Sequence, residues 1–198
     1  MEIPGDDEIR ALHERYAPGE AAFETVWTHC SIVCEIAEQI MERAAPAVDA
    51  DLVRAGCLLH DLGVYRLYGP SGKIDTRGYV RHGLLGHAIL RDEGFPEEIR
   101  RFCSCHTGVG LTRDDIVRQG LPLPAGDYVA VTAEERLVMY ADKFHSKTSP
   151  PTFVSAAAYA GRVRRYGDEK VPVFEAMRET FGEPDLRPLV AKYGHGLV

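Results

Sequence analysis

The strongest constraint on the fold is a helical periodicity in a chain with few strand signals. From about Gly19 to Ala44, apolar side chains recur at steps of three and four residues and so share one face of a long helix, which Pro46 ends. Sustained apolar-polar alternation is rare, and no Asn-Gly or Asp-Gly turn lies between β-branched runs. The pattern predicts an all-α fold. The inward stripe of the long helix consists of Val26, His29, Val33, Ile36 and Ile40.

Capping and breaking residues divide the rest of the chain into further helices. Asp49 is placed to cap a helix that ends at His60-Asp61, and Thr132 with Glu135 matches a capping box. Segments 65–79 and 107–128 are rich in Gly and Pro, so we expect a loop beside the His60-Asp61 pair and an excursion over the surface. The other expected helices cover 82–93, 96–106, 114–119, a segment from 133 that carries Asp142 and His145, 152–166 and 171–181, followed by a Gly-containing tail.

Composition sets the class of protein and excludes some partners. The chain has 198 residues, of which 45% are hydrophobic, enough for one core, so we expect a single domain. A net charge of -7 argues against a nucleic-acid polymer as partner, because that affinity depends on clustered Lys and Arg. The start of the chain lacks a signal-peptide pattern and no apolar run spans a bilayer, so we expect a cytoplasmic protein without membrane contact. The five cysteines lack disulfide-framework or zinc-knuckle spacing and are expected to be reduced.

Histidines beside helix ends and apolar runs indicate a metal site. Asp61 and Asp142 lie in apolar surroundings, where an ionised carboxylate is costly unless a cation or several hydrogen bonds compensate it. Imidazole and carboxylate together suit Fe, Mn, Zn, Co or Ni better than Ca or Mg. Because adjacent side chains diverge at a helix end, His60 and Asp61 are able to hold two neighbouring ions. The histidines in question are His29, His60, His82, His87 and His106.

These motifs resemble the HD-domain superfamily of metal-dependent phosphohydrolases over roughly Thr28 to Lys147. Four segments carry the resemblance: Leu-Leu-His-Asp-Leu-Gly at 58–63, Arg-His-Gly-Leu-Leu-Gly at 81–86, Cys-His-Thr at 105–107 and Tyr-Ala-Asp-Lys at 140–143. The resemblance implies a single-domain helical bundle over 1–198, with a metal-site core at about 20–148 and C-terminal helices at about 152–182. It also implies a binuclear centre of two divalent transition-metal ions, Fe or Mn first. The implied ligands are His29, His60, Asp61, His82, His106 and Asp142.

The same resemblance implies hydrolysis of a phosphate ester or anhydride in a small, nucleotide-like substrate, as in small bacterial HD proteins that hydrolyse nucleotides. Asp61 then bridges the ions and orients the attacking water, and Lys143 contacts the substrate phosphate. Val64 stands where the cyclic-dinucleotide phosphodiesterases of this superfamily have lysine, and no Gly-Tyr-Pro follows, which disfavours cyclic dinucleotides. Further candidates for substrate contact are Arg66, Lys73, Arg81, His87, His145 and Lys147.

Two other functions are compatible with the same residues. Some HD proteins with this ligand set resemble mixed-valent diiron oxygenases, which need oxygen, whereas phosphohydrolysis does not. A metal-bearing sensor domain without turnover is the non-enzymatic alternative, although the intact ligand series disfavours it. The fold by itself does not select among these functions. A homodimer is compatible with the sequence.

Overall fold

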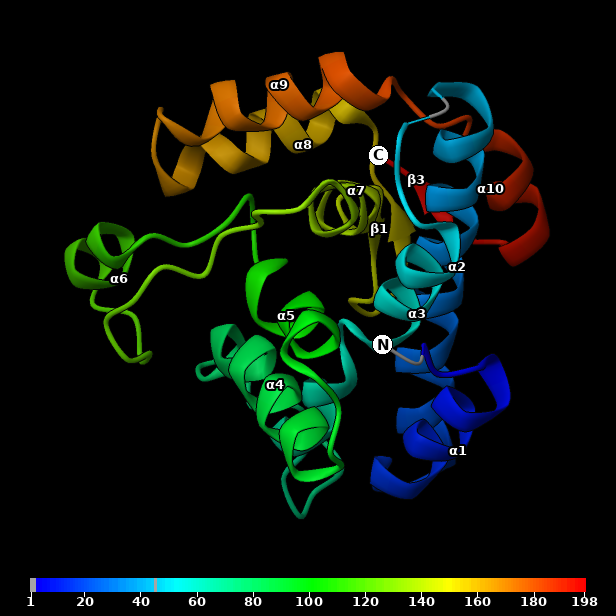
Figure 1. Ribbon diagram of the computed structural model, residues 1–198, viewed down its shortest axis with the longest axis vertical. Coiled ribbons are helices and arrows are strands. Elements are labelled where there is room, and N and C mark those ends of the chain that lie inside the picture. The colour runs from blue at the N-terminus through cyan, green and yellow to red at the C-terminus, as the bar shows by residue number, and fades with distance from the viewer. Residues whose placement is uncertain (1–2, 45) are drawn as a thin grey trace.

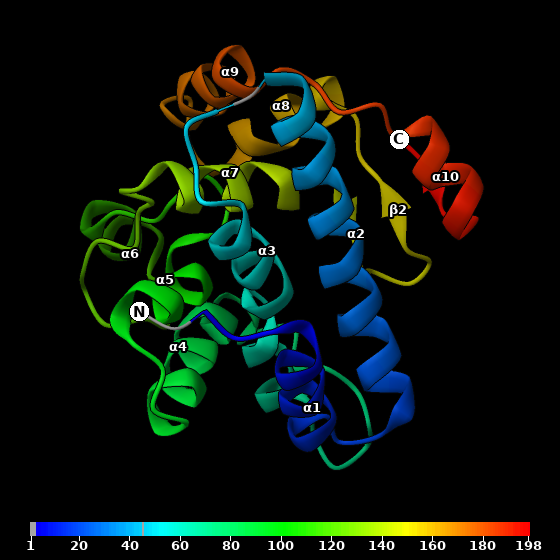
Figure 2. The ribbon, with the colours of Figure 1, turned by 45° about the vertical axis from the view of Figure 1, so that its right-hand side comes forward.

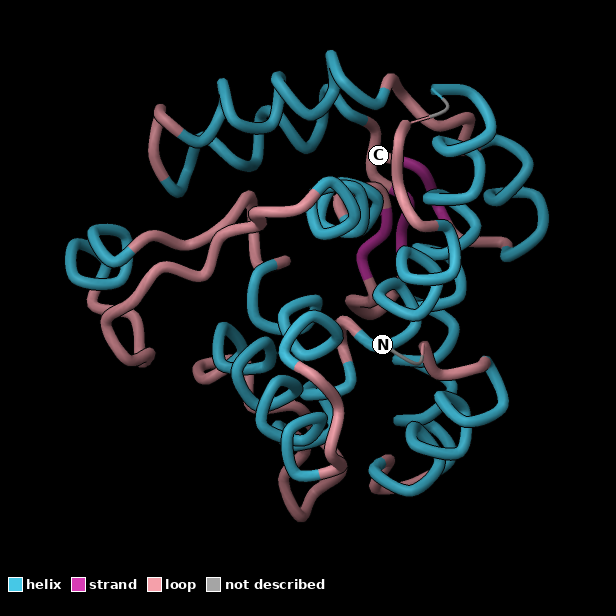
Figure 3. Tube along the Cα trace, in the orientation of Figure 1, coloured by secondary structure: helices cyan, strands magenta, loops and turns pink. Residues whose placement is uncertain are grey.

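The computed structural model describes residues 3–44 and 46–198, and Met1, Glu2 and Ala45 of the predicted 1–198 domain lie outside the described residues. Helices make up most of the described chain, and strands are confined to one small patch (Figure 1, Figure 3). The predicted all-α class is therefore confirmed. Within the described ranges, no helix is long and apolar enough to cross a membrane.

The long helix α2 (Glu20–Ala44) forms the spine of the core, as its apolar stripe predicts. Its inward residues Val26, Val33, Ile36 and Ile40 are at most 1% exposed. It packs against α3 (Ala50–Leu59) and α7 (Ala133–Asp142), and Figure 2 shows it running along the molecule beside them. Both predicted caps are present: the Asp49 carboxylate accepts backbone N–H bonds at the start of α3, and the Thr132 capping box opens α7.

A second layer forms beside α3 from four short 3-10 and α-helical pieces. The 3-10 helix η1 (Leu62–Leu67) follows α3 directly, and η2 (Tyr79–Arg81) leads into α4 (His82–Asp92), which packs on α5 (Glu97–Cys105). The expectation of a loop from residue 65 is therefore wrong at its start, because Tyr65 and Leu67 bury apolar side chains in η1. The remainder, to residue 78, is irregular, with one bridge between Tyr68 and Ile74.

Helix α1 (Asp6–Tyr16) was not expected from the sequence, and a buried histidine joins it to the core. His13 Nε2 lies 2.8 Å from the Leu58 carbonyl oxygen and Nδ1 lies 2.9 Å from the Tyr65 hydroxyl. Because the carbonyl only accepts, Nε2 carries the proton and Nδ1 accepts from Tyr65. Both ring nitrogens of His13 are thus satisfied inside the protein.

The C-terminal third departs most from the sequence-based expectations. Helix α7 ends at Asp142, so His145 is not on it but in strand β1 (His145–Ser146). Strand β1 pairs antiparallel with β2 (Thr152–Phe153), and β2 pairs in parallel with β3 (Gly196–Leu197). Residues 152–155, expected to be helical, are therefore extended. The following elements are α8 (Ala156–Val163), 3-10 helix η3 (Arg164–Tyr166), the predicted α9 (Lys170–Phe181), and an unexpected α10 (Arg187–Tyr193).

The segment 107–128 extends away from the core and carries the short helix α6 (Arg113–Gln119) at its far end (Figure 1). It is not only a surface excursion, because Val109, Asp115 and Ile116 are buried against the rest of the protein. All five cysteines are buried, and none of them is in a disulfide.

Candidate metal centre

The six predicted ligands lie in one buried cluster, although five helices contribute to it. Five of their side chains are at most 6% exposed, and that of Asp142 is 16% exposed. His29 lies on α2, His60 and Asp61 directly follow α3, His82 begins α4, His106 follows α5, and Asp142 ends α7. Positions at helix ends free five of these side chains from the direction of the helix surface, and they converge on His29, which points inward from the middle of α2.

Asp61 stands between two groups of imidazoles. Its Oδ2 is 3.1 Å from His29 Nε2 and 3.6 Å from His60 Nε2. Its Oδ1 is 3.5 Å from His82 Nε2 and 3.7 Å from His106 Nε2. Asp61 Oδ1 is also buried without a hydrogen-bond partner in the structure, an arrangement that costs free energy unless a cation compensates it. One carboxylate is thus positioned to serve two adjacent sites.

Backbone carbonyls set the direction of three of the histidine rings. His60 Nδ1 is 2.7 Å from the Cys57 oxygen, His82 Nδ1 is 2.6 Å from the Tyr79 oxygen, and His106 Nδ1 is 3.0 Å from the Phe102 oxygen. A carbonyl only accepts, so in the neutral ring Nδ1 carries the proton and Nε2 presents a lone pair. This is the arrangement by which proteins orient metal-binding imidazoles.

Those lone pairs face one another, which is the clearest sign that the cluster suits a metal ion. Nε2 of His60 lies 3.3 Å from Nε2 of His29. The unprotonated Nε2 atoms of His82 and His106 are 2.9 Å apart. Two unprotonated nitrogens at that distance repel unless a positive charge lies between or beside them. Two groups of three ligand atoms lie close enough for one ion each: His29, His60 and Asp142, and His60, Asp61 and His106. The residues present therefore fit a divalent metal.

Burial and neighbouring charges set the protonation states of these groups. Burial lowers the pKa of His82 to about 3 and also lowers the pKa of His106, so both rings are neutral at pH 7. Burial raises the pKa of Asp61, but Lys147 and His60 outweigh it and hold the pKa well below its usual value. Burial lowers the pKa of His60, but Cys30 and Asp61 outweigh it and raise the pKa well above its usual value, so metal binding at His60 would displace a proton. The centre therefore combines two neutral imidazoles and ionised carboxylates with one imidazole that must lose a proton to bind metal.

Two lysines contact the carboxylates from the pocket side. The Lys147 ammonium donates to Asp61 Oδ2 and lies 5.5 Å from the centre of the Tyr79 ring. The Lys143 ammonium donates to Asp142 Oδ2 at 2.7 Å and to the His106 carbonyl at 2.8 Å. Lys143 therefore has one donor left, whereas Lys147 has two.

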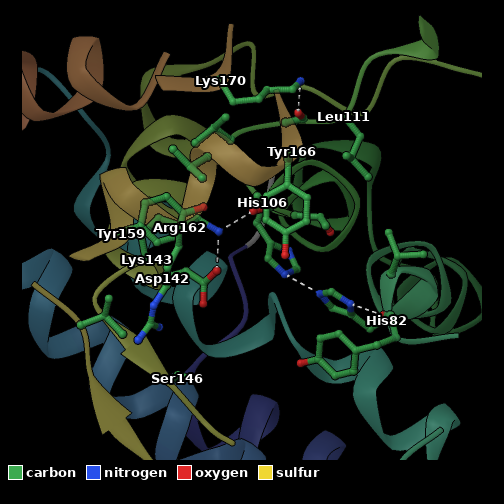
Figure 4. Close-up of a pocket in the computed structure, with 18 of the residues that line it drawn as sticks. His82, His106, Leu111, Asp142, Lys143, Ser146, Tyr159, Arg162, Tyr166 and Lys170 are labelled. Carbon is green, nitrogen blue, oxygen red and sulfur yellow. Dashed lines mark hydrogen bonds and ion pairs between the residues drawn. The ribbon is translucent and has the colours of Figure 1, made fainter. Parts of the chain in front are cut away.

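The cluster forms the floor of a cavity of about 550 Å³ (Figure 4). Its walls come from segment 107–111, segment 145–148, which begins with β1, and the α8–η3 region. Figure 4 shows His82 and His106 meeting on one side and Asp142 with Lys143 on the other. Of the predicted substrate-contact residues, Lys143, His145 and Lys147 line this cavity.

The other four predicted substrate contacts lie elsewhere. Arg66 is exposed and stacks over the Tyr16 ring at 5.5 Å, and Lys73 and Arg81 are exposed outside the cavity lining. His87 faces α5, where its Nε2 is 3.1 Å from Glu97 Oε1. Nearness to the His60-Asp61 pair in sequence does not bring these side chains to the pocket, because they lie on η1, the irregular segment after it, η2 and α4, outside the cavity lining.

Sequence reasoning did not find the upper wall of the cavity. Tyr159, Arg162 and Tyr166 line the cavity from α8 and η3, and Tyr79 lines it from η2. These residues lie in no motif, and the amphipathic pattern of 152–166 does not distinguish a side that faces a pocket from one that faces solvent. Only the packing of α8 over the metal centre shows their position.

Glycines allow the close approach that assembles the site. A Cβ added at Gly63 would come within 2.0 Å of the His82 carbonyl oxygen, and one at Gly83 within 2.6 Å of the Cys103 carbonyl oxygen. Gly63 therefore lets η1 touch the start of α4, and Gly83 lets α4 touch α5. These contacts bring His82 beside Asp61 and His106.

The arrangement agrees with a comparison against protein families, in which the HD domain model matches residues 26–147. The chain belongs to the HD domain family. The matched range covers the α2-to-α7 region and all six clustered residues, and the predicted superfamily is confirmed.

Relatives of this HD domain protein differ in length and in assigned activity. An uncharacterised protein of Methanocaldococcus jannaschii is 36% identical over 122 residues, which are 60% of this chain and 65% of that protein. The tRNA (cytidine(56)-2'-O)-methyltransferase of Picrophilus torridus is 31% identical over 144 residues, 73% of this chain and 37% of that enzyme. That of Thermoplasma volcanium is 33% identical over 136 residues, 69% of this chain and 36% of that enzyme. The chain thus spans less than two thirds of these relatives.

Solved structures support the fold of this HD domain protein. The HD domain of the L. monocytogenes phosphodiesterase PgpH has a TM-score of 0.55 at 16% identity, over 93% of this chain and 98% of that one. The same domain in complex with cyclic-di-AMP has a TM-score of 0.54, also at 16% identity, over 93% of this chain and 96% of that one. At this identity the likeness establishes the shared fold.

Proposed function

We propose that this HD domain protein is a metal-dependent phosphohydrolase that cleaves a phosphate ester or anhydride in a small, nucleotide-like substrate. The observation that carries the proposal is a buried His/Asp cluster with unsatisfied lone pairs that opens directly into a cavity bearing cationic side chains. Cavities of this size accept small molecules rather than polymers.

Two ions are proposed, with Asp61 shared between them. His29, His60 and Asp142 would hold one ion, and His82 and His106 the other, because the two oxygens of Asp61 face these two groups separately. When bound, such ions supply an acidified water and neutralise charge on a phosphoryl group. The mixed nitrogen and oxygen donors favour Fe or Mn, with Zn, Co or Ni also suited.

The protein's own cations would hold the substrate phosphate against the cluster. Lys147 reaches Asp61 from the cavity side and has two donors free, so it is the first candidate for a phosphoryl oxygen. Lys143 is tied to Asp142 and the His106 carbonyl, so its main role is to hold Asp142 in place, with one donor left for substrate. Asp61 would orient the attacking water and accept its proton.

The upper wall suits the nucleoside part of such a substrate. Tyr79, Tyr159 and Tyr166 offer aromatic faces, and Arg162 adds a guanidinium that is able to stack on a base or bind a second phosphate. Apolar side chains from Val109, Leu111 and Leu121 complete the wall. An apolar, aromatic cavity with a few convergent charges is typical of small-molecule sites.

The test is phosphate release from a panel of nucleotides, dinucleoside polyphosphates and cyclic dinucleotides, measured with added manganese in the presence and absence of oxygen. Cyclic-di-AMP belongs in the panel because the neighbouring PgpH domain is solved with it. About two transition-metal ions per chain with oxygen-independent release are expected. An iron pair that turns over only with oxygen, or a chain that binds metal and releases no phosphate from any member, would contradict the proposal.

A matched pair of lysine variants sharpens this test. Lys147→Met removes a cation from the cavity, whereas Lys73→Met removes one from an exposed position outside it. We expect kcat/KM to fall by roughly 10- to 100-fold in the first variant and to stay unchanged in the second, since a charge-assisted hydrogen bond contributes about 1.5–3 kcal/mol. Equal effects of the two changes would remove Lys147 from the mechanism.

A further inference from the structure

Three histidines form a chain from the metal centre to the C-terminal strand. His29 Nδ1 is 2.9 Å from His145 Nδ1, and His145 Nε2 is 2.9 Å from His195 Nδ1. The ring centroids are 5.2 Å and 5.1 Å apart, with interplanar angles of 29° and 24°. Because the nitrogens are much closer than the ring centres, the rings meet edge to edge, as N–H···N hydrogen bonds require.

The position of His29 determines the direction of both bonds. Its Nε2 faces Asp142 Oδ1 at 3.0 Å and Asp61 Oδ2 at 3.1 Å, on the metal side. A neutral imidazole that ligates through Nε2 carries its proton on Nδ1 and donates it to His145 Nδ1. His145 must then carry its own proton on Nε2, and it donates that proton to His195 Nδ1.

The small sheet holds His195 in place for this contact. His145 pairs with Phe153 across β1 and β2, and Phe153 pairs with Leu197 across β2 and β3. The Val198 N–H donates to the Phe153 carbonyl at 3.0 Å. The fully buried Phe153 ring packs against both imidazoles, with centroids 5.0 Å from His145 and 5.9 Å from His195. The last residues of the chain are thereby coupled to the metal centre.

We propose that His145 and His195 are positioning residues for the metal, acting through the chain His29→His145→His195. Ligation at His29 orders both hydrogen bonds, and these bonds hold the His29 ring in its ligating orientation and raise its basicity. The inference rests on the proposed metal-dependent function, because it assigns partners to one of the proposed ligands. It adds a residue from the C-terminal tail, outside the HD domain match at 26–147.

The direct test is the tautomeric state of the two rings in the full chain loaded with zinc, which is diamagnetic. Long-range proton–nitrogen NMR of histidine-labelled protein is expected to show His145 and His195 protonated on Nε2, with Nδ1 of each accepting. Protonation of His145 on Nδ1 would overturn this inference alone, since that ring then accepts nothing from His29. A chain that binds no zinc would overturn it together with the proposed function.

Zinc affinity of four variants tests the positioning role against simple docking of the tail. We expect His195→Ala to weaken zinc binding by about 3- to 10-fold, less than the 10- to 100-fold typical of a group that touches a ligand directly, which we expect for His145→Ala. His195→Asn, whose side-chain oxygen replaces Nδ1 as acceptor, should restore affinity to within about 2-fold. Val198→Pro, which removes a strand hydrogen bond and keeps His195, should also stay within about 2-fold. A loss with Val198→Pro equal to that with His195→Ala, or no rescue by Asn, would overturn the proposal.

Discussion

Two buried carboxylates, Asp61 and Asp115, show how this protein separates structure from function. Both are almost fully buried, at 1% and 2% exposure. Asp115 accepts from the Thr112 N–H and hydroxyl and from Arg118, each at 2.8 Å, and its second cation is the Lys170 ammonium. Asp61 has Lys147 on one oxygen and no hydrogen-bond partner for the other. The protein's own groups thus satisfy the Asp115 carboxylate, whereas one oxygen of Asp61 remains available to a ligand.

Two buried histidines repeat the contrast. His13 has a carbonyl acceptor at one nitrogen and a hydroxyl donor at the other, so its hydrogen-bonding needs are met. His82 has a carbonyl at Nδ1, but its Nε2 faces another unprotonated Nε2. A buried polar group whose needs are met stabilises the fold, whereas one whose needs are unmet indicates a missing cation.

The largest expected effect is the loss of activity on removal of the Asp61 carboxylate. Asp61→Ala removes the carboxylate proposed to bridge both ions, so bound metal and phosphate release should fall together, with activity reduced by at least about three orders of magnitude. Helical content by circular dichroism should be largely retained, because Asp61 lies after α3 rather than within a helix. Full turnover in this variant, measured beside its metal content, would remove Asp61 from the centre.

The matching change at Asp115, the carboxylate with protein partners, should affect stability instead of metal binding. Asp115→Asn breaks the buried pair with Lys170 and is expected to lower the free energy of unfolding by about 3–5 kcal/mol, with metal stoichiometry unchanged. Urea denaturation and metal analysis measure the two effects. Loss of metal without loss of stability would reverse the assignment of the two aspartates.

The difference in stability between wild type and Asp115→Asn should depend on pH in a defined direction. Burial raises the pKa of Asp115, but Lys170 and Thr112 outweigh it and hold the pKa below its usual value of 3.8. A carboxyl with a lowered pKa contributes stability above its ordinary pKa and loses it as the pH falls. Wild type and Asp115→Asn should therefore differ most at neutral pH and converge in acid.

Removal of metal should destabilise the wild type by a smaller amount. At a free metal concentration of 100 times the dissociation constant, binding to the folded state alone adds about 2.7 kcal/mol, so a chelator should lower Tm. The same chelator should leave the Tm of Asp61→Ala unchanged, because that variant holds no metal. An equal fall in both proteins would indicate that the chelator acts elsewhere.

The smallest effect concerns His13, the satisfied histidine. Burial lowers the pKa of His13 to about 4 from 6.5, so the unfolded chain binds a proton that the folded chain does not as the pH falls below 6.5. This group should cost the wild type about 2 kcal/mol of stability between pH 7 and pH 5. His13→Gln should lack that part of the slope, as measured by urea denaturation at both values. Identical slopes would show that His13 titrates normally.

Local patterns accounted for the helices other than α1 and α10, and the motif resemblance supplied the six clustered residues, because both depend on signals that lie within short segments. The Asp49 cap, the Thr132 capping box, the stripe of α2 and the His60-Asp61 pair are short-range features, and each was found where expected. The sequence-based predictions were wrong where pairing between distant segments decides the secondary structure. His145 follows a helical pattern but is drawn into β1 by pairing with Phe153, and residues 152–155 are extended for the same reason.

The sequence by itself determined the helical class, the family and the six residues proposed as metal ligands. Tertiary structure alone decided which basic residues reach the pocket: Lys147 does, whereas Arg66, Lys73, Arg81 and His87 do not. It alone placed Tyr159 and Arg162 above the centre and His195 behind it. The reason is physical: periodicity and caps are encoded over a few neighbouring residues, while the side chains that share a cavity come from segments more than a hundred residues apart, brought together only by packing of the whole core.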